Sequence, residues 1–209
     1  MKINLRLLSW GAFATSVLVL VTSCVSPDTR HHVVISVPEQ RLAVLDQGTL
    51  LATYPISTSK FTISDVPGSR GTPLGELEVA EKIGAGAPLG AVFKSRRRTG
   101  EILVPDAPGR DPIVTRILWL RGREAQNRNA HGRLIYIHGT AEERMIGQPA
   151  SYGCIRMRSR DVIQLYDVVG PGARVSIVTT PLASILPALS TGAQVANAAT
   201  QLGNGAIAQ

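Results

Sequence analysis

The chain of 209 residues has only two cysteines, Cys24 and Cys154, and aromatic residues make up 4% of it. It contains no internal repeat, no glycine-rich phosphate-binding motif and no cysteine and histidine cluster with metal-ligand spacing, because the pair His31-His32 is too weak a signal alone. We therefore expect neither a metal ion nor an organic cofactor. The few aromatic residues and the lack of a nucleic-acid-binding motif argue against a nucleic-acid partner.

No apolar run at the N-terminus is long enough for a plain membrane anchor. Residues 1–23 combine a positively charged start, a largely apolar segment at 7–20 that is short of the roughly 20 residues a spanning helix needs, and small residues before Cys24. This pattern predicts a signal peptide. The ending VTSC resembles a bacterial lipoprotein box, which implies cleavage before Cys24 and lipid attached to Cys24.

The lipoprotein pattern also predicts where the protein is located in the cell. Lipid would tether the mature chain to a membrane without spanning it. Val25 after the cysteine resembles the pattern that sends lipoproteins to the outer membrane of Gram-negative bacteria, so we expect an exported, periplasmic protein. A lipidated Cys24 cannot form a disulfide, which leaves Cys154 as an unpaired exported thiol and suggests catalysis.

The segment around Cys154 carries the chemistry. Residues 151–157 read SYGCIRM, and residues 138–140, HGT, follow an apolar run that predicts a strand. A histidine at a rigid strand end can take the proton of a thiol, and the thiolate attacks carbonyl carbon. Cys154 is thus the candidate nucleophile and His138 the candidate base. Taken singly, a buried cysteine or a strand-end histidine is more often structural. His131 ranks below His138 because its surroundings are typical of a loop.

These segments together resemble the signature of the L,D-transpeptidase catalytic domain, a family of peptidoglycan enzymes with a cysteine nucleophile. The resemblance extends upstream to residues 33–60, with STS at 57–59, and to GTPLG at 71–75, and covers roughly residues 33–180. One position departs from the family, which commonly has histidine where this chain has Tyr152. Tyrosine cannot act as a base near neutral pH, so the base role stays with His138.

The resemblance implies acyl transfer on the cell wall without a cofactor. Cys154 would form a thioester with a tetrapeptide stem and release D-alanine, and an amine from another stem, a protein lysine or a free D-amino acid would accept the acyl group. Gly153, with Ser151 and Tyr152 beside it, would support the loop and the oxyanion. Arg156 would hold the loop or meet a substrate carboxylate, and Gly139 and Thr140 are further candidate substrate contacts.

The net positive charge of the chain favours anionic binding partners. Lys and Arg number 22 against 15 acidic residues, and removal of Lys2 and Arg6 with the signal peptide leaves 20 against 15, or +5. The densest basic run, at residues 94–98, lies in a glycine-rich stretch. Stem-peptide carboxylates and anionic lipid head groups are both suitable counterparts.

The pattern of the mature chain predicts a mainly β domain, and the resemblance implies a β-sandwich with one or two short helices. We expect a hairpin over residues 33–45 and 50–56, strands at 77–83, 102–104, 113–120, 134–138 and 174–178, and a helix over 161–169. Residues 58–75 and 84–100 have loop composition. The expected organisation is a signal peptide (1–23), a tether (24–32), the catalytic domain (33–180) and a flexible Ala-rich tail (181–209).

Two other functions share these features. A carboxypeptidase or hydrolase would use the same site with water as acceptor, and the choice depends on whether water reaches the thioester. A non-catalytic wall-binding lipoprotein would keep the fold, although a binding module has no need of an exposed thiol.

Overall fold

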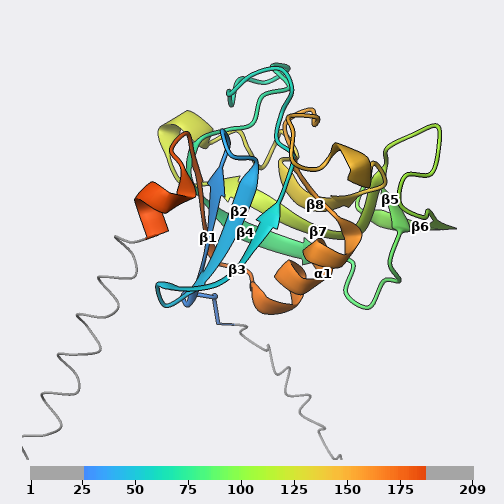
Figure 1. Cartoon of the computed structure of the whole chain (residues 1–209), viewed down its shortest axis with the longest axis horizontal. Helices are drawn as coiled ribbons and strands as arrows, with labels where there is room; N and C mark the ends of the chain where they lie inside the picture. The colour runs from blue at the N-terminus through green and yellow to red at the C-terminus, as the bar shows by residue number, and fades with distance from the viewer. Residues whose placement is uncertain (1–25, 187–209) are drawn as a thin grey trace, which may run out of the picture.

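The strands of the protein form one continuous curled sheet. The computed structural model describes residues 26–186. Figure 1 shows the sheet with α1 packed against it. The strands are β1 (His31–Ser36), β2 (Arg41–Asp46), β3 (Thr49–Pro55), β4 (Gly75–Ile83), β5 (Ala91–Lys94), β6 (Arg97–Ile102), β7 (Ile113–Gly122), β8 (Tyr136–Thr140), β9 (Ile155–Met157) and β10 (Arg174–Val178). The mainly β fold is therefore confirmed, with the layers of the expected sandwich joined into one sheet.

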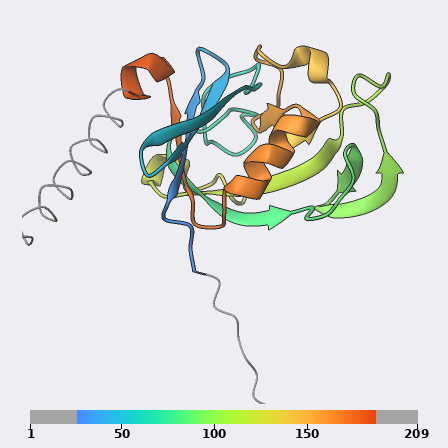
Figure 2. The ribbon, with the colours of Figure 1, turned by 60° about the horizontal axis from the view of Figure 1, so that its bottom comes forward.

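The sheet branches at β7. Its main path runs β3-β2-β1-β10-β4-β7-β5-β6, while β8 pairs with β7 and then with β9. The pairs β1/β10 and β8/β9 are parallel, and the others are antiparallel. Figure 2 shows how the sheet curls around α1 (Ser159–Val168). His138 lies on β8 and Cys154 directly precedes β9, so this branch brings the two residues onto neighbouring strands.

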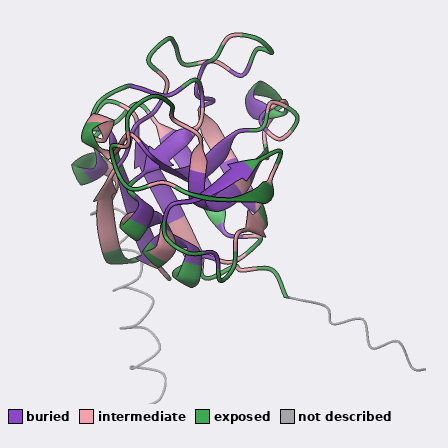
Figure 3. Ribbon diagram, turned by 90° about the vertical axis from the view of Figure 1, so that its right-hand side faces the viewer, coloured by how far each residue is buried: buried purple, intermediate pink, exposed green. Residues whose placement is uncertain are grey.

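Alternating apolar residues on the strands build the main core. One face of β1, β2, β4, β7, β8 and β10 contributes fully buried side chains that meet Val162 and Leu165 of α1. Figure 3 shows these buried strands at the centre, with exposed loops around them. The predicted helix is present, starting two residues earlier than expected. Its first amide, that of Ser159, donates to Glu143 Oε1 at 2.7 Å, so a distant carboxylate and not a local cap satisfies the helix N-terminus.

Four predicted segments differ from the structure. The run expected as one strand at residues 33–45 is two strands, β1 and β2, which pair antiparallel, and the strand expected at 102–104 is only the end of β6, which stops at Ile102. The loop expected at residues 84–100 contains the hairpin of β5 and β6, because Val92 and Phe93 are buried against β7 while β6 is a wholly exposed edge strand with three charged residues. The strand expected at 134–138 is β8 at Tyr136–Thr140, so His138 lies at mid-strand and not at its end.

The boundaries of the domain also differ. Asp28 is fixed against Gly170 and Pro171, and β1 begins at His31, so most of the predicted tether belongs to the fold. Residues 182–186 are helical, and Leu182, Ile185 and Leu186 cover the outer face of β1 and β2. Their apolar side chains recur at helical spacing, which explains why this part of the predicted flexible tail packs. The signal peptide, Cys24 and the tail from residue 187 lie outside the described residues.

Candidate active site

Strands β8 and β9 place Cys154 and His138 on one face of the sheet. Ile137 pairs with Ile155 and His138 with Arg156 in a parallel register, and both isoleucines point into the main core. Because side chains alternate along a strand, His138 and Arg156 point to the opposite face. Cys154, directly before β9, continues that alternation. The thiol therefore shares this face with the imidazole of the neighbouring strand.

Cys154 is a half-buried, neutral thiol at rest. Its Sγ lies 3.4 Å from the carbonyl oxygen of Leu134, to which it donates, and it packs against an apolar cluster that includes Phe93 and Tyr136. Burial raises the pKa of the Cys154 thiol to about 11, although the backbone at Tyr136 and the charges of Arg156 and Arg133 act in the other direction. Leu134 holds its carbonyl there in a left-handed conformation, with φ 61°.

His138 is buried and neutral, with a defined tautomer. Its Nδ1 lies 2.9 Å from the carbonyl oxygen of Gly139. A carbonyl accepts only, so Nδ1 carries the hydrogen and Nε2 keeps a lone pair. Burial lowers the pKa of His138 to about 4, with the Arg156 charge acting in the same direction and the Gly139 hydrogen bond and Asp111 opposing it. The imidazole is thus a proton acceptor at neutral pH.

The loop before Cys154 is fixed by its own polar groups. Ser151 Oγ donates to the Cys154 carbonyl at 2.6 Å and accepts the Gly153 amide at 3.1 Å, and Thr72 Oγ1 donates to the Gly153 carbonyl at 3.0 Å. Gly153 has φ 120°, and a Cβ there would lie 2.9 Å from the Gly71 oxygen. Ser151 and Gly153 therefore support the loop. The Gly153 amide donates to Ser151 Oγ in this structure, and its expected role as an oxyanion donor stays a prediction.

Arg156 is held by carboxylates of the protein itself. Its guanidinium lies 2.6 Å from Asp111 Oδ2 and 3.4 Å from Glu142 Oε2, and its side chain is 10% exposed. Thr140 Oγ1 donates to the same Asp111. The structure thus supports the loop-holding role of Arg156. In this structure both Arg156 and Thr140 bond to Asp111, and their expected contacts with substrate stay predictions.

Gly139 is needed for close packing of the backbone. A Cβ at this position would lie 2.6 Å from the Val114 oxygen and 3.2 Å from Thr115 Cβ. Thr115 sits in a bulge of β7 opposite Gly139, with φ 72°, a rare conformation for a β-branched residue. The bulge and the glycine fit together beside His138. Gly139 accordingly fixes the backbone beside the candidate base His138, and its expected substrate contact stays a prediction.

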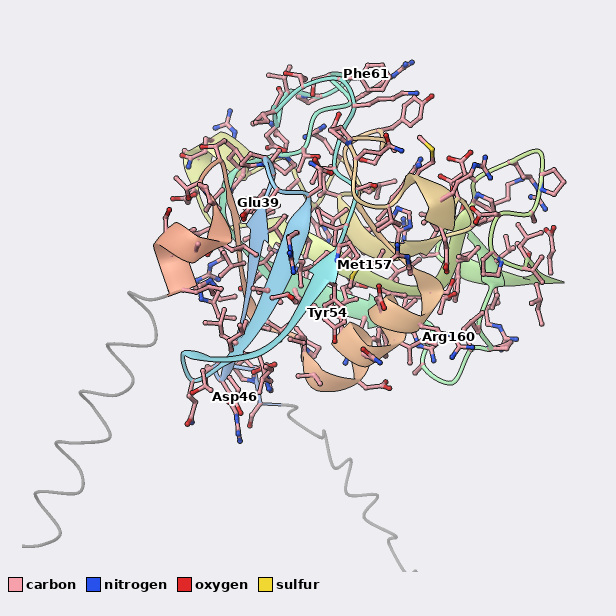
Figure 4. The ribbon with its side chains drawn as sticks, in the orientation of Figure 1. Glu39, Asp46, Tyr54, Phe61, Met157 and Arg160 are labelled. Atoms are coloured by element: carbon pink, nitrogen blue, oxygen red, sulfur yellow. The ribbon has the colours of Figure 1, made fainter. Side chains whose placement is uncertain are left out.

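Tyr152 belongs to an exposed aromatic and cationic surface. The residue is 55% exposed. Its ring lies 5.1 Å from the Phe61 ring, with Lys60 Nζ 4.8 Å and the Arg70 guanidinium 5.5 Å from its centroid. In Figure 4 Phe61 stands at the far end of the molecule from Asp46. A cleft of about 540 Å³ adjoins this surface, and its lining includes Lys60, Asp111, Glu142, Tyr152 and Arg156.

The loop at residues 58–75 is tied to the site. Arg133 lies 2.9 Å from Asp65 Oδ1, with both side chains buried, and also donates to the Gly71 carbonyl at 2.8 Å. Arg133 directly precedes Leu134, whose carbonyl accepts the thiol. The loop and the cysteine are therefore coupled through one short segment.

His131, the lower-ranked base, has a different place. Its ring stacks on Trp119 at 3.9 Å with an interplanar angle of 7°, and Trp119 Nε1 donates to its carbonyl oxygen at 3.1 Å. The His131 ring therefore packs against the Trp119 indole. Within residues 26–186 no group of three metal-ligating side chains occurs, and no helix of that range is long and apolar enough to cross a membrane.

Sequence reasoning missed three contributors to the site. Asp111 gives no signal, because a single acidic residue in a Gly- and Pro-rich stretch is common. Tyr136 could have been found, since alternation along a strand puts residues 136, 138 and 140 on one face. Leu134 could not, because nothing in its residue type predicts the left-handed backbone that turns its carbonyl to Cys154.

Comparison with known proteins decides the family. The model of the YkuD family, the L,D-transpeptidase catalytic domain, matches residues 30–177. The chain belongs to the L,D-transpeptidase catalytic domain family. It is 31% identical over 176 residues to the probable L,D-transpeptidase YcfS of Escherichia coli, a match that covers 81% of this chain and 51% of that protein. It is 27% identical over 172 residues to the putative L,D-transpeptidase YkuD of Bacillus licheniformis, covering 81% and 79%.

Solved L,D-transpeptidases are also similar. One from Mycobacterium smegmatis has 16% identity and a TM-score of 0.47, covering 71% of this chain and 58% of that one. The chain spans about half the length of several curated L,D-transpeptidases that it matches. Family membership thus rests on the sequence match across the part of the chain that carries His138 and Cys154.

Proposed function

We propose that the protein is a peptidoglycan L,D-transpeptidase in which Cys154 is the nucleophile and His138 the base. The observation that carries this proposal is the His138 ring on β8: its Nδ1–H is committed to the Gly139 carbonyl, so Nε2 is left as a proton acceptor on the face that Cys154 shares. Membership of the family supports the reaction class.

The first half of the reaction makes a thioester. Cys154 Sγ attacks the carbonyl carbon between the L-centre of the third stem residue and the terminal D-alanine, while the thiol proton passes to His138 Nε2. The oxyanion then collapses, the carbon–nitrogen bond breaks, and the same proton goes to the amine of the leaving D-alanine. In the second half an amine attacks the thioester, loses a proton to His138, and Cys154 recovers its thiol.

The pKa values set the timing of proton transfer. A thiol of pKa about 11 beside an imidazole of pKa about 4 rests as a neutral pair, not as thiolate and imidazolium. The proton must therefore move as the sulfur attacks. Arg156 and Arg133 favour the thiolate that develops during this step, since both charges lower the pKa of Cys154.

We propose transfer to an amine as the outcome. The cleft of about 540 Å³ lined by Tyr152 and Arg156 is a candidate site for the acceptor, and an aligned amine outcompetes water through high effective molarity. The acceptor is a second stem peptide, a wall-attached protein or a free D-amino acid.

Product analysis tests this function. The purified chain is incubated with tetrapeptide muropeptides and a D-amino acid, and the products are identified by mass spectrometry. We expect cross-linked dimers or exchanged stems that have lost one D-alanine, and none from the Cys154→Ala variant. Tripeptide monomers alone would instead identify a hydrolase.

We further propose that lipid on Cys24 anchors the protein in the periplasm, at the outer membrane. The Asp28 carboxylate accepts the Gly170 amide at 2.7 Å, and its own amide donates to the Pro171 carbonyl at 2.7 Å. Only three residues separate Cys24 from Asp28, so four Cα-to-Cα steps give a reach of about 14 Å at most. Arg30 pairs with Asp46, so the chain enters at the end of the molecule opposite Phe61 (Figure 4).

Such an anchor would hold the Asp46 end toward the lipid surface and leave the Phe61 end toward the wall. Labelled fatty acid should be incorporated into the wild-type chain and not into Cys24→Ser. Incorporation into the variant refutes the assignment of Cys24.

A further inference from the structure

Arg96 is a cation placed beside the candidate active site by an unfavourable turn. It lies in the two-residue loop between β5 and β6, where Ser95 and Arg96 have φ of 49° and 65°. Turns with two left-handed residues favour Asn and Gly. An arginine at the second position is therefore costly for the hairpin, and its side chain needs another reason to be there.

The side chain of Arg96 turns inward. Lys94, Arg97 and Arg98 of the same hairpin are exposed, whereas Arg96 is half-buried. Its guanidinium lies 4.6 Å from the centre of the Trp119 ring, and its Nη1 lies 3.4 Å from Tyr136 Oη. Cation–aromatic contact and the tyrosine hydroxyl together hold the charge in one place.

Trp119 and Tyr136, with His131 stacked on Trp119, form an aromatic platform under Arg96. His131 stacks on Trp119 at 3.9 Å, and Trp119 meets Tyr136 edge to face. Glu81 lies 3.8 Å from His131 and not within ion-pair distance of Arg96. Among residues 26–186 no carboxylate pairs with Arg96, and Tyr136 is the one residue that accepts a hydrogen bond from it. Most of its five N–H donors are thus available.

The platform borders Cys154. Tyr136 precedes the residue of β8 that pairs with Ile155, so it lies across from Cys154. Trp119 and Tyr136, together with Phe93, belong to the apolar cluster against which Cys154 packs. From the thiol outward the packed side chains are first apolar, with Trp119 partly exposed, and then cationic at Arg96.

We infer that Arg96 binds the side-chain carboxylate of the diamino acid whose carbonyl Cys154 attacks. That residue has methylene groups next to the reacting centre and, when it is diaminopimelate, a carboxylate at its end, which matches an apolar wall ending in a guanidinium. This inference rests on the proposed function. It gives Arg96 a carboxylate contact, whereas Arg156 is bonded to Asp111 in this structure.

Two substrates isolate this contact. Tetrapeptide stems with meso-diaminopimelate or with L-lysine at the third position differ by one carboxylate. For the wild-type chain we expect kcat/KM to favour the diaminopimelate stem, and Arg96→Gln should lower that value about 10- to 100-fold while leaving the lysine stem within twofold. Arg98→Gln, the same change at an exposed position of β6, should alter neither.

Folding of the hairpin is controlled separately. Arg96→Gly supplies the residue that the turn prefers, so it should lose the same selectivity without a fall in the thermal unfolding midpoint. Equal losses on both stems, or no loss on either, would overturn the role of Arg96 while leaving the transpeptidase function standing. No product from the wild-type chain with either stem would overturn the proposed function, and this inference with it.

Discussion

Replacing Arg156 by methionine should destabilise the fold more than it weakens substrate binding. Arg156 Nη2 lies 2.6 Å from Asp111 Oδ2, and the two side chains are 10% and 11% exposed. Methionine keeps much of the length and removes the charge. Asp111 would then remain a buried anion, with the Thr140 hydroxyl and the Glu142 amide as its remaining donors.

The magnitude follows from that orphaned charge. Breaking a buried ion pair by removing one partner costs about 3–5 kcal/mol. Because Asp111 keeps two donors, we expect a loss of unfolding free energy near the lower end, about 3 kcal/mol. The double variant Arg156→Met/Asp111→Asn removes both charges and should recover about 2 kcal/mol of that loss.

Urea unfolding at pH 7, followed by tryptophan fluorescence, measures these differences. Arg160→Met is the matched control, since Arg160 is exposed on α1 and should change stability by no more than about 0.5 kcal/mol. If Arg156→Met cost less than about 1 kcal/mol and instead raised KM for stem peptides, Arg156 would be a substrate contact and its assignment here would be wrong.

Three further predictions concern the thiol, the imidazole and the glycine between the strands. In a Cys24→Ser background, the iodoacetamide alkylation rate of Cys154 should rise about tenfold per pH unit from pH 7 to 10, because its pKa is about 11; a plateau below pH 8 would reveal a resting thiolate. The folded pKa of His138, about 4, lies below the ordinary 6.5, so the unfolded chain alone takes up this proton as pH falls from 6.5 to 4. Stability should drop by about 3 kcal/mol over that window, and urea titrations of His138→Gln should show a shallower fall. Gly139→Ala should cost about 1–3 kcal/mol and reduce kcat, because its Cβ would lie 2.6 Å from the Val114 oxygen; unchanged stability would show that the β7 bulge yields.

The candidate nucleophile and base, Cys154 and His138, stand out in the sequence because their setting is local. The SYGCIRM and HGT segments each combine a chemically competent residue with strand or turn composition. The pairing of β8 with β9 then brings two segments close in sequence together. Candidate roles that depend only on residues near in the sequence could therefore be predicted from it.

Contacts that depend on residues distant in the sequence could not be predicted from it. Arg156 and Thr140 had the chemistry of substrate contacts, but Asp111, which occupies both, lies in another loop. The β5 and β6 hairpin was hidden because its apolar part is only Ala91 to Phe93 and its second strand is an exposed, charged edge. Arg96 acquires its position only through that hairpin and Trp119, so no local pattern distinguishes it from the basic residues around it.

The most direct test of the account is the intact mass of the chain after exposure to a carbapenem, whose strained amide should acylate the active thiol. We expect one adduct with the full mass of the carbapenem, mapped to Cys154 by peptide analysis. It should be lost in Cys154→Ser and form much more slowly in His138→Gln. An unmodified wild-type chain, or an adduct that persists in the folded Cys154→Ser variant, would contradict the claim that Cys154 is the acyl-accepting nucleophile.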